Sequence, residues 1–145
     1  MGFGFTKIYI GNTDFYRVDI LVGHYKDSKK CWAKFKGIID TGATQTSINR
    51  EMAESLGLKP VRETEYITSG TPQKGYVYVT DLKINNTIYV EPFEIGSIED
   101  SPLGVEALIG TDILDKCDIA ITHANGNTKL TMEWPSIRDI DFRQM

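Results

Sequence analysis

Residues 35–47 read F-K-G-I-I-D-T-G-A-T-Q-T-S, and this segment decides both the expected fold and the expected chemistry. An apolar run that ends at Ile39 is typical of a buried strand, and Gly42, directly after Thr41, favours a tight turn. The sequence therefore places one carboxylate, Asp40, at the tip of a buried strand. Burial raises the pKa of a carboxyl group unless hydrogen bonds offset it, and general acid–base chemistry is commonly built on such groups.

A second segment downstream completes a pattern. Residues 107–110 read A-L-I-G, and the T-D-I-L that follows them favours a short helix. Together with I-I-D-T-G-A-T at residues 38–44, this order of motifs resembles the retropepsin-like aspartic proteases over roughly residues 31–134. The resemblance implies an all-β fold, mainly antiparallel and closed as an acid-protease-like barrel, with two short helices. It also implies an aspartic endopeptidase, and it calls for no metal and no cofactor.

Length and charge narrow the class of protein. The 145 residues are enough for one core, and we expect a single retropepsin-like domain over residues 1–145, with its core at about 15–134. The formal net charge is −4, and no more than two lysine or arginine residues are adjacent. A nucleic-acid-binding surface needs a basic patch, so we expect no nucleic acid partner.

The expected cellular location depends on whether the sequence contains a membrane span or a signal peptide. No apolar run approaches the length of a membrane span, and residues 1–6 do not read as a signal peptide. The two cysteines, Cys31 and Cys117, are far apart in the chain, and reduced thiols are their expected state. We therefore expect a cytoplasmic protein that does not bind membranes.

Local signals predict the remaining elements. Asn49 is a suitable N-cap for a helix over residues 50–56, and residues 85–86 and 125–126 (Asn-Asn and Asn-Gly) favour the turns of two hairpins. His24 falls in a polar stretch, residues 24–30, that predicts an exposed loop. Asp112 is expected to cap the second helix, and its alternative role is that of a second catalytic acid.

Residues 68–74 form a turn-rich tip between two β-rich segments, residues 64–67 and 75–80. The sequence alone predicts a surface hairpin. The resemblance implies that this hairpin is a mobile flap that folds over the substrate and excludes water. Ser69, Gly70 and Thr71 at its tip are then expected to offer backbone hydrogen bonds to a bound peptide.

The number of D-T-G motifs implies a dimer. Aspartic proteolysis needs two carboxylates that face one water molecule, and this chain carries one such motif. The second Asp40 is therefore expected from a second copy, with the active site on the two-fold axis of a homodimer and a peptide or protein as substrate. The resemblance further implies that Thr41 hydrogen-bonds across the axis, Gly42 lets the backbone approach the carboxylates, and Ala43 lies near the substrate.

Three other classes of function remain open at this stage. The first is a module that keeps the retropepsin fold and binds peptides or dimerises without cleaving, against which the intact D-T-G-A argues. The second is an enzyme that forms an aspartyl phosphate at Asp40 near Mg²⁺. That chemistry needs alternating helices and a parallel sheet, which this sequence does not predict. The third is a purely structural β-domain.

Overall fold

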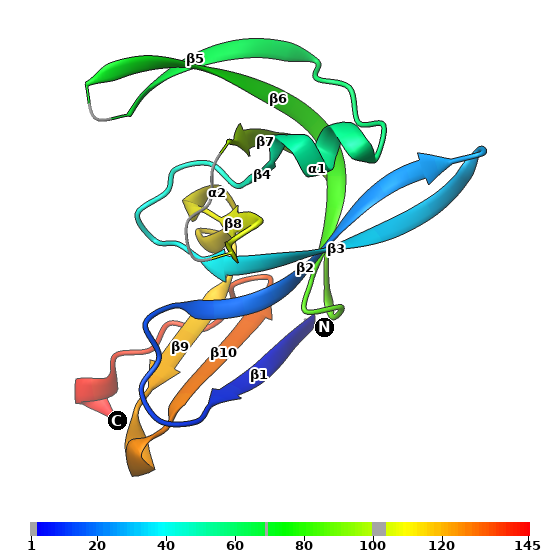
Figure 1. Cartoon of the computed structure of the whole chain (residues 1–145). Helices are drawn as coiled ribbons and strands as arrows, with labels where there is room; N and C mark the ends of the chain where they lie inside the picture. Colours follow the sequence, from blue (N-terminus) through cyan, green and yellow to red (C-terminus); the bar gives the residue numbers. More distant parts are fainter. Residues whose placement is uncertain (1–2, 69, 100–103) are drawn as a thin grey trace.

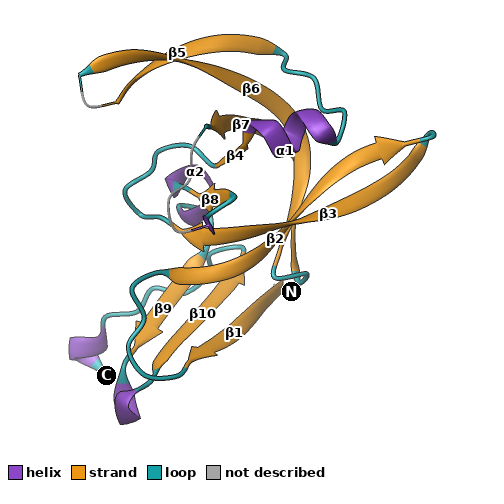
Figure 2. Cartoon of the chain, viewed as in Figure 1, coloured by secondary structure: helices purple, strands orange, loops and turns teal. Residues whose placement is uncertain are grey.

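The computed structural model describes residues 3–68, 70–99 and 104–145, most of them in strands (Figure 1). Its two α-helices are short (Figure 2). In chain order the elements are β1 (Phe3–Tyr9), β2 (Tyr16–Lys26), β3 (Lys29–Ile39), β4 (Ser47–Asn49), α1 (Arg50–Ser55), β5 (Arg62–Thr68), β6 (Thr71–Ile84), β7 (Ile88–Ile98), β8 (Ala107–Ile109), α2 (Thr111–Leu114), β9 (Asp118–Thr122) and β10 (Thr128–Trp134).

Six strands close into a barrel. Neighbours follow the order β2-β3-β8-β4-β7-β6, and β6 pairs back onto β2, where Ile20 lies opposite Ile84. The pairings are antiparallel except for β3 with β8 and β4 with β7. These features confirm the expected mainly antiparallel, closed barrel with two short helices.

The core follows the alternation of the strands. On β2 the side chains of Val18, Ile20 and Val22 are buried, because successive residues of a strand point to opposite faces. The largest fully buried side chains of the barrel come from several strands and from α2: Phe35, Ile48, Tyr78, Leu82, Ile84, Ile88, Ile95, Ile109 and Ile113. They hold the barrel together by burial of apolar surface.

Two further units extend from the barrel. Strand β5 pairs only with β6, so the β5–β6 hairpin projects and arches over one end of the barrel (Figure 1). Strands β1, β10 and β9 form a separate antiparallel sheet at the other end. Leu130 and Met132 of β10 are fully buried and join this sheet to the barrel core.

Local turn chemistry agrees with the sequence. Helix α1 begins after Asn49, whose side-chain oxygen accepts a hydrogen bond from Met52 N at 2.9 Å. Asn85, Asn86 and Asn125 all have positive φ at their hairpin turns, which asparagine tolerates better than most residues. The expected helix cap and both expected hairpins are therefore confirmed.

The polar stretch over residues 24–30, expected to be a loop, lies mostly in strands instead. β2 continues to Lys26, and the turn before β3 has only Asp27 and Ser28, both at positive φ. His24 therefore pairs with Cys31 across the strands and is half-buried, so its expected place in an exposed loop is wrong. The polar residues misled the prediction, because a projecting hairpin tolerates polar side chains on both faces.

The connection expected over residues 95–106 begins later than predicted. Strand β7 runs to Ile98, and Ile95 is fully buried, because β4 pairs with this end of β7 and covers it. Cys31 and Cys117 are both free thiols, as expected. In the described part of the chain, no helix has the length and apolar character needed to cross a membrane.

Candidate active site

Asp40 lies at the carboxyl end of β3, directly after the buried residues Ile38 and Ile39. Strand β8 runs parallel to this end of β3, and its last residue, Ile109, accepts a hydrogen bond from Asp40 N at 2.9 Å. The two sequence motifs therefore meet as adjacent strands in the middle of the barrel. Their pairing fixes the backbone at Asp40 on a buried support, while the Asp40 side chain is half-buried.

The turn after Asp40 orients its carboxylate. Gly42 N donates a hydrogen bond to Asp40 Oδ1 at 2.9 Å, and Ala43 N donates one to Asp40 O at 3.2 Å. A Cβ atom at Gly42 would lie 3.3 Å from Oδ1, closer than most real Cβ contacts. Glycine therefore suits this turn, and the carboxylate keeps its second oxygen, Oδ2, free of any described hydrogen bond.

Helix α2 supports the active-site loop from behind. Asp112 accepts hydrogen bonds from Thr46 N at 2.9 Å and from Thr46 Oγ1 at 2.7 Å, and Thr111 N donates to Ala43 O at 2.8 Å. A Cβ atom at Gly110 would lie 2.8 Å from Ala43 O, so glycine is needed where the two segments meet. The glycine of the second motif thus lets α2 pack against the loop of the first.

Asp112 does not cap α2, contrary to the expectation from sequence. The N-cap is Gly110, which makes no side-chain capping bond, and Asp115 is the C-cap. Both Asp112 oxygens accept hydrogen bonds from the Thr46 backbone or hydroxyl group, which holds the carboxylate on the loop. Its position is that of a supporting residue.

A cleft of about 1260 Å³ opens above Asp40. Its floor is formed by the active-site loop and β8, and its opposite wall by the β5–β6 hairpin and the end of β7. The lining residues are Asp40, Gly42, Ala43, Thr44, Gln45, Ser47, Thr64, Glu65, Tyr66, Thr71, Gln73, Gly75, Tyr76, Gly96, Ser97, Ile98, Glu99 and Leu108. The arrangement places a carboxylate and a large open space on the same side of the barrel.

The structure brings several expected site residues to this cleft. Asp40, Gly42, Ala43 and Thr71 line it. Thr41 is exposed beside it, and its hydroxyl makes no hydrogen bond to another described residue. Gly70 lies at the hairpin turn with a φ of 78°, outside the cleft lining. Ser69 is outside the described residues.

Other residues that line the cleft were not expected from the sequence. Tyr66 and Glu65 come from β5, Tyr76 from β6, and Glu99 follows β7. Arg50, at the start of α1, lies behind this wall, where its guanidinium carbon is 5.3 Å from the centre of the Tyr76 ring. Alternation along residues 62–68 could have suggested which side chains share a face, but the sequence has no signal for which face meets the cleft.

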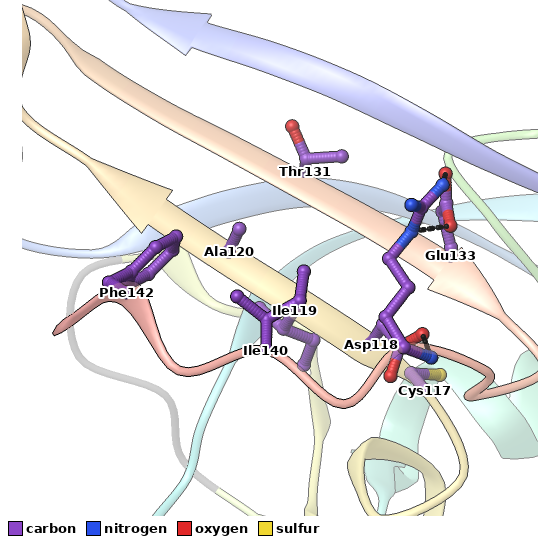
Figure 3. Close-up of a pocket in the computed structure, with 9 residues that line it drawn as sticks. Cys117, Asp118, Ile119, Ala120, Thr131, Glu133, Ile140 and Phe142 are labelled. Atoms are coloured by element: carbon purple, nitrogen blue, oxygen red, sulfur yellow. Dashed lines mark hydrogen bonds and ion pairs between the residues drawn. The ribbon is translucent and has the colours of Figure 1, made fainter. Parts of the chain in front are cut away.

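A second cavity of about 490 Å³ lies between the C-terminal segment and β9 (Figure 3). Asp118 holds that segment, because its carboxylate accepts hydrogen bonds from the backbone N–H groups of Ile137 and Arg138, each at 2.8 Å. Burial raises the pKa of the neighbouring Cys117 thiol to about 12, which keeps it protonated. The Cys117 thiol is therefore not activated as a nucleophile.

Metal-ligating side chains do not cluster in the part of the chain that the structure describes. Among residues 3–68, 70–99 and 104–145, no group of three or more histidine, cysteine, aspartate or glutamate side chains could hold a metal ion. What the cleft offers is a carboxylate that a hydrogen bond from Gly42 N holds on the turn after β3. A carboxylate in a cleft is a group suited to general acid–base chemistry.

Comparisons with known proteins agree with this geometry. The family model described as "gag-polyprotein putative aspartyl protease" matches residues 33–116, more than half of the chain. The solved structure of a retropepsin-like aspartic protease from Rickettsia conorii is similar with a TM-score of 0.55 and 19% identity, over 94% of this chain and 97% of that chain.

Two further solved structures are similar at lower scores. The retroviral protease-like domain of Ddi1 from Leishmania major has a TM-score of 0.48 and 18% identity, over 81% of this chain and 94% of that one. The simian foamy virus (mac) protease has a TM-score of 0.43 and 15% identity, over 68% and 91%. No curated protein matches the chain. The match of the family model, together with the barrel and the D-T-G loop, shows that this chain belongs to the retropepsin-like aspartic proteases.

Proposed function

We propose that the protein is an aspartic endopeptidase that works as a homodimer, with Asp40 of each copy supplying one carboxylate of the catalytic pair. The observation that carries this proposal is the position of Asp40. It is a half-buried carboxylate on the floor of a cleft of about 1260 Å³, and its Oδ1 accepts a hydrogen bond from Gly42 N at 2.9 Å.

The proposed chemistry uses both carboxylates and one water molecule. Two carboxylates in contact do not both ionise, because their like charges repel, so the pair shares one proton. The ionised carboxylate accepts a proton from the water as the water oxygen attacks the peptide carbonyl carbon. The protonated carboxyl group donates its proton to the carbonyl oxygen, which gives a neutral tetrahedral diol. In the collapse of the diol, the carboxyl group that was protonated in the first step gives its proton to the amine nitrogen, and the other carboxylate accepts the proton of one diol hydroxyl. The C–N bond breaks, and the pair again shares one proton.

Two features support the remaining parts of the proposal. Thr41 is exposed next to Asp40 and free to hydrogen-bond with the loop of a second copy. The β5–β6 hairpin arches over one end of the barrel (Figure 1), and residues of both its strands line the cleft. Its outer end is held by the pairing of β5 with β6 alone. We assign this hairpin as a flap, with the backbone of Gly70 and Thr71 offering hydrogen bonds to a bound peptide strand.

Replacing the proposed catalytic group tests the mechanism directly. Asp40→Asn keeps the shape of the side chain and removes the proton-transfer group, so we expect cleavage of a peptide library to be lost while the fold is retained. Asp115→Asn is the matched control, because Asp115 is exposed at the end of α2 and does not line the cleft. Circular dichroism of both variants would check the fold.

The dimer makes a separate prediction. Activity per chain should fall on dilution where the dimer dissociates, since a monomer holds half of the site. Excess Asp40→Asn mixed with wild-type chain should also suppress activity, because the mixed dimer has one carboxylate. Full activity of Asp40→Asn, or of a chain that sedimentation shows to be a monomer, would contradict the shared pair. Peptide binding without cleavage would instead favour a binding module.

A further inference from the structure

One side chain at the start of α1 joins separate segments behind the wall of the cleft. Arg50 is half-buried and does not itself line the cleft. Its Nε lies 2.8 Å from Glu99 Oε1, its Nη1 lies 3.3 Å from Glu54 Oε1, and its guanidinium carbon is 5.3 Å from the centre of the Tyr76 ring. Glu99 and Tyr76 both line the cleft, so Arg50 contacts two lining residues from outside it.

The end of β7 is bound by two consecutive residues. Asn49 Nδ2 donates a hydrogen bond to Glu99 O at 3.2 Å, and Arg50 Nε donates one to the Glu99 carboxylate. Strand β4, which ends at Asn49, leads from the active-site loop to these two residues. A further bond joins β7 to that loop, because Gly96 N donates to Thr46 O at 2.8 Å. The end of β7 is therefore fixed to the active-site loop.

The base of the β5–β6 hairpin has a less regular attachment. The register of β6 with β7 begins at Tyr78, opposite Ile95. Before it, the N–H group of Tyr76 donates to Ser97 Oγ at 2.9 Å, so a side-chain hydroxyl takes the place of a backbone carbonyl. A hydroxyl on a rotatable side chain is a less fixed acceptor than a carbonyl of a strand. The Arg50 guanidinium over the Tyr76 ring adds a second attachment, to α1.

We propose that Arg50 is a positioning residue for peptide binding. It holds the base of the hairpin, at Tyr76, and the end of β7, at Glu99, in one arrangement, so that this part of the cleft wall is formed before a peptide arrives. This inference rests on the proposed endopeptidase function, since the peptide in the cleft is taken to be the substrate. A wall formed in advance loses less conformational freedom on binding, which strengthens binding without changing the chemistry.

The contacts of Arg50 explain why the residue is arginine. A planar guanidinium donates to a carboxylate and also lies over an aromatic ring, whereas lysine has a single compact ammonium group. Arg50→Lys therefore keeps the positive charge and can still pair with Glu99, but it cannot cover the Tyr76 ring at the same time. This variant removes the proposed positioning with the smallest change in charge.

Amide exchange of the full chain, measured by NMR, tests the arrangement without a ligand. The Tyr76 amide should exchange roughly threefold to tenfold faster in Arg50→Lys than in the wild type, because the base of the hairpin opens more readily. The amides of residues 82–84, in the barrel, should change much less. A Tyr76 amide that is unprotected in the wild type, or equally protected in both chains, overturns the inference. Equal acceleration at residues 82–84 also overturns it, since that result means a general loss of stability.

A second arginine–glutamate pair provides the matched control. Arg138 Nε lies 3.0 Å from Glu133 Oε2, and neither residue lines the cleft. Glu133 belongs to β10, in the sheet at the other end of the barrel. Arg138→Lys should leave exchange of the Tyr76 amide as in the wild type. The same acceleration in Arg138→Lys as in Arg50→Lys would overturn the inference.

Kinetics show whether the arrangement serves binding. On the library peptide that the wild type cleaves fastest, we expect Arg50→Lys to raise KM roughly threefold to tenfold and to change kcat by less than about twofold. The reason for the small change in kcat is that Gly42 N, not Arg50, orients Asp40. An unchanged KM, or a fall in kcat alone, overturns the inference.

The inference and the proposed function fail in different ways. If the wild type cleaves no peptide, the endopeptidase proposal fails, and exchange of the Tyr76 amide still decides whether Arg50 holds the cleft wall. If the wild type cleaves and Arg50→Lys equals it in both KM and Tyr76 exchange, only the inference fails.

Discussion

Strand β6 has two unlike halves. From Val77 to Ile84 nearly every side chain is buried or half-buried in the barrel, and Leu82 and Ile84 are fully buried. From Thr71 to Lys74 every side chain is exposed. The inner half lies between two strands, whereas the outer half pairs with β5 alone. Both halves have cross-strand pairing, so the difference between them is burial. Because little burial holds the outer half, we expect it to open more readily than the inner half.

The change between the halves falls at Tyr76. Its N–H donates to Ser97 Oγ at 2.9 Å, and the Arg50 guanidinium covers its ring. Beyond this residue the strand leaves β7 and becomes the proposed flap. The same strand therefore links the barrel core to the wall of the cleft. Four measurements can test the contrast between its halves.

Hydrogen exchange should show the largest contrast. We expect the amides of residues 82–84 to exchange at least about a thousandfold more slowly than those of residues 73–75, because the inner amides open only with the barrel. A peptide-like inhibitor should slow exchange in the outer half and leave the inner half unchanged. Slow exchange at residues 73–75 without ligand, unaffected by the inhibitor, would show that the hairpin is not a flap.

Truncation of a core side chain should have the second largest effect. Leu82→Ala removes a fully buried side chain, and we expect it to lower the free energy of unfolding by about 2–5 kcal/mol. Thr71→Ala, at the exposed end of the same strand, should change it by less than about 0.5 kcal/mol. Chemical denaturation of both variants measures the contrast, and similar losses in the two would refute it.

The buried ion pair of the inner half predicts a dependence on pH. Asp81 is 4% exposed, with Lys30 Nζ at 2.6 Å and the Tyr89 hydroxyl at 2.9 Å. Burial raises the pKa of Asp81, but the hydrogen bonds from Lys30 and Tyr89 outweigh it and hold the pKa below its ordinary value. A lowered pKa adds stability above the pKa of the unfolded chain, and this stability is lost as the pH falls through the folded-state pKa.

Asp81→Asn should therefore destabilise the barrel near pH 7 and matter less in acid. We expect the free energy of unfolding to fall by about 1–2 kcal/mol at pH 7. This is less than for a fully buried ion pair, because the Lys30 side chain is 32% exposed. The difference in the free energy of unfolding between variant and wild type should become smaller as the pH falls below about 4. Denaturation at a series of pH values measures this difference. A difference that grows in acid would mean that folding raises the pKa of Asp81 instead of lowering it.

The smallest effect on stability should come from the outer half. A Cβ atom at Gly75 would lie 3.1 Å from Tyr66 Cδ1, so Gly75→Ala displaces the ring by a few tenths of an ångström at little cost in stability. Because the Tyr66 ring lines the cleft, we expect KM to rise about twofold to fivefold while thermal unfolding shifts by no more than about 2 °C. An unchanged KM would remove Tyr66 from the binding surface.

The sequence predicted the parts of the fold that carry strong local signals. Asn49 caps a helix and Asn85 turns a hairpin for reasons contained in a few neighbouring residues. The place of Asp40 at the end of a buried strand could be predicted, because an apolar run and a glycine turn adjoin it. The role of Asp112 escaped prediction, because Thr46, its hydrogen-bond partner, is 66 residues away. An aspartate near the start of a helix fits a helix cap and a support for a distant loop equally well.

The wall of the cleft could not be read from the sequence for a similar reason. Glu65 and Glu99 meet the cleft only because β5 pairs with β6 in one register and β7 ends beside α1. Register and twist are set by the whole barrel. The outer part of the β2–β3 hairpin, residues 24–31, was not predicted as strand. Its polar residues, His24 among them, resemble a loop when their strand partner is unknown.

The pairing of β1 with β10 has a consequence for how the chain folds. Phe5 lies opposite Met132, and the hydroxyls of Thr6 and Thr131 are 3.1 Å apart, although 125 residues separate the two threonines. Contacts between such distant residues form late, because a large loop must close first. During synthesis on the ribosome, β1 has no sheet partner until β10 has emerged. The half-buried aromatic side chains of Phe5 and Tyr9 are then open to other chains, so chaperones should influence the yield of this protein more than its final stability.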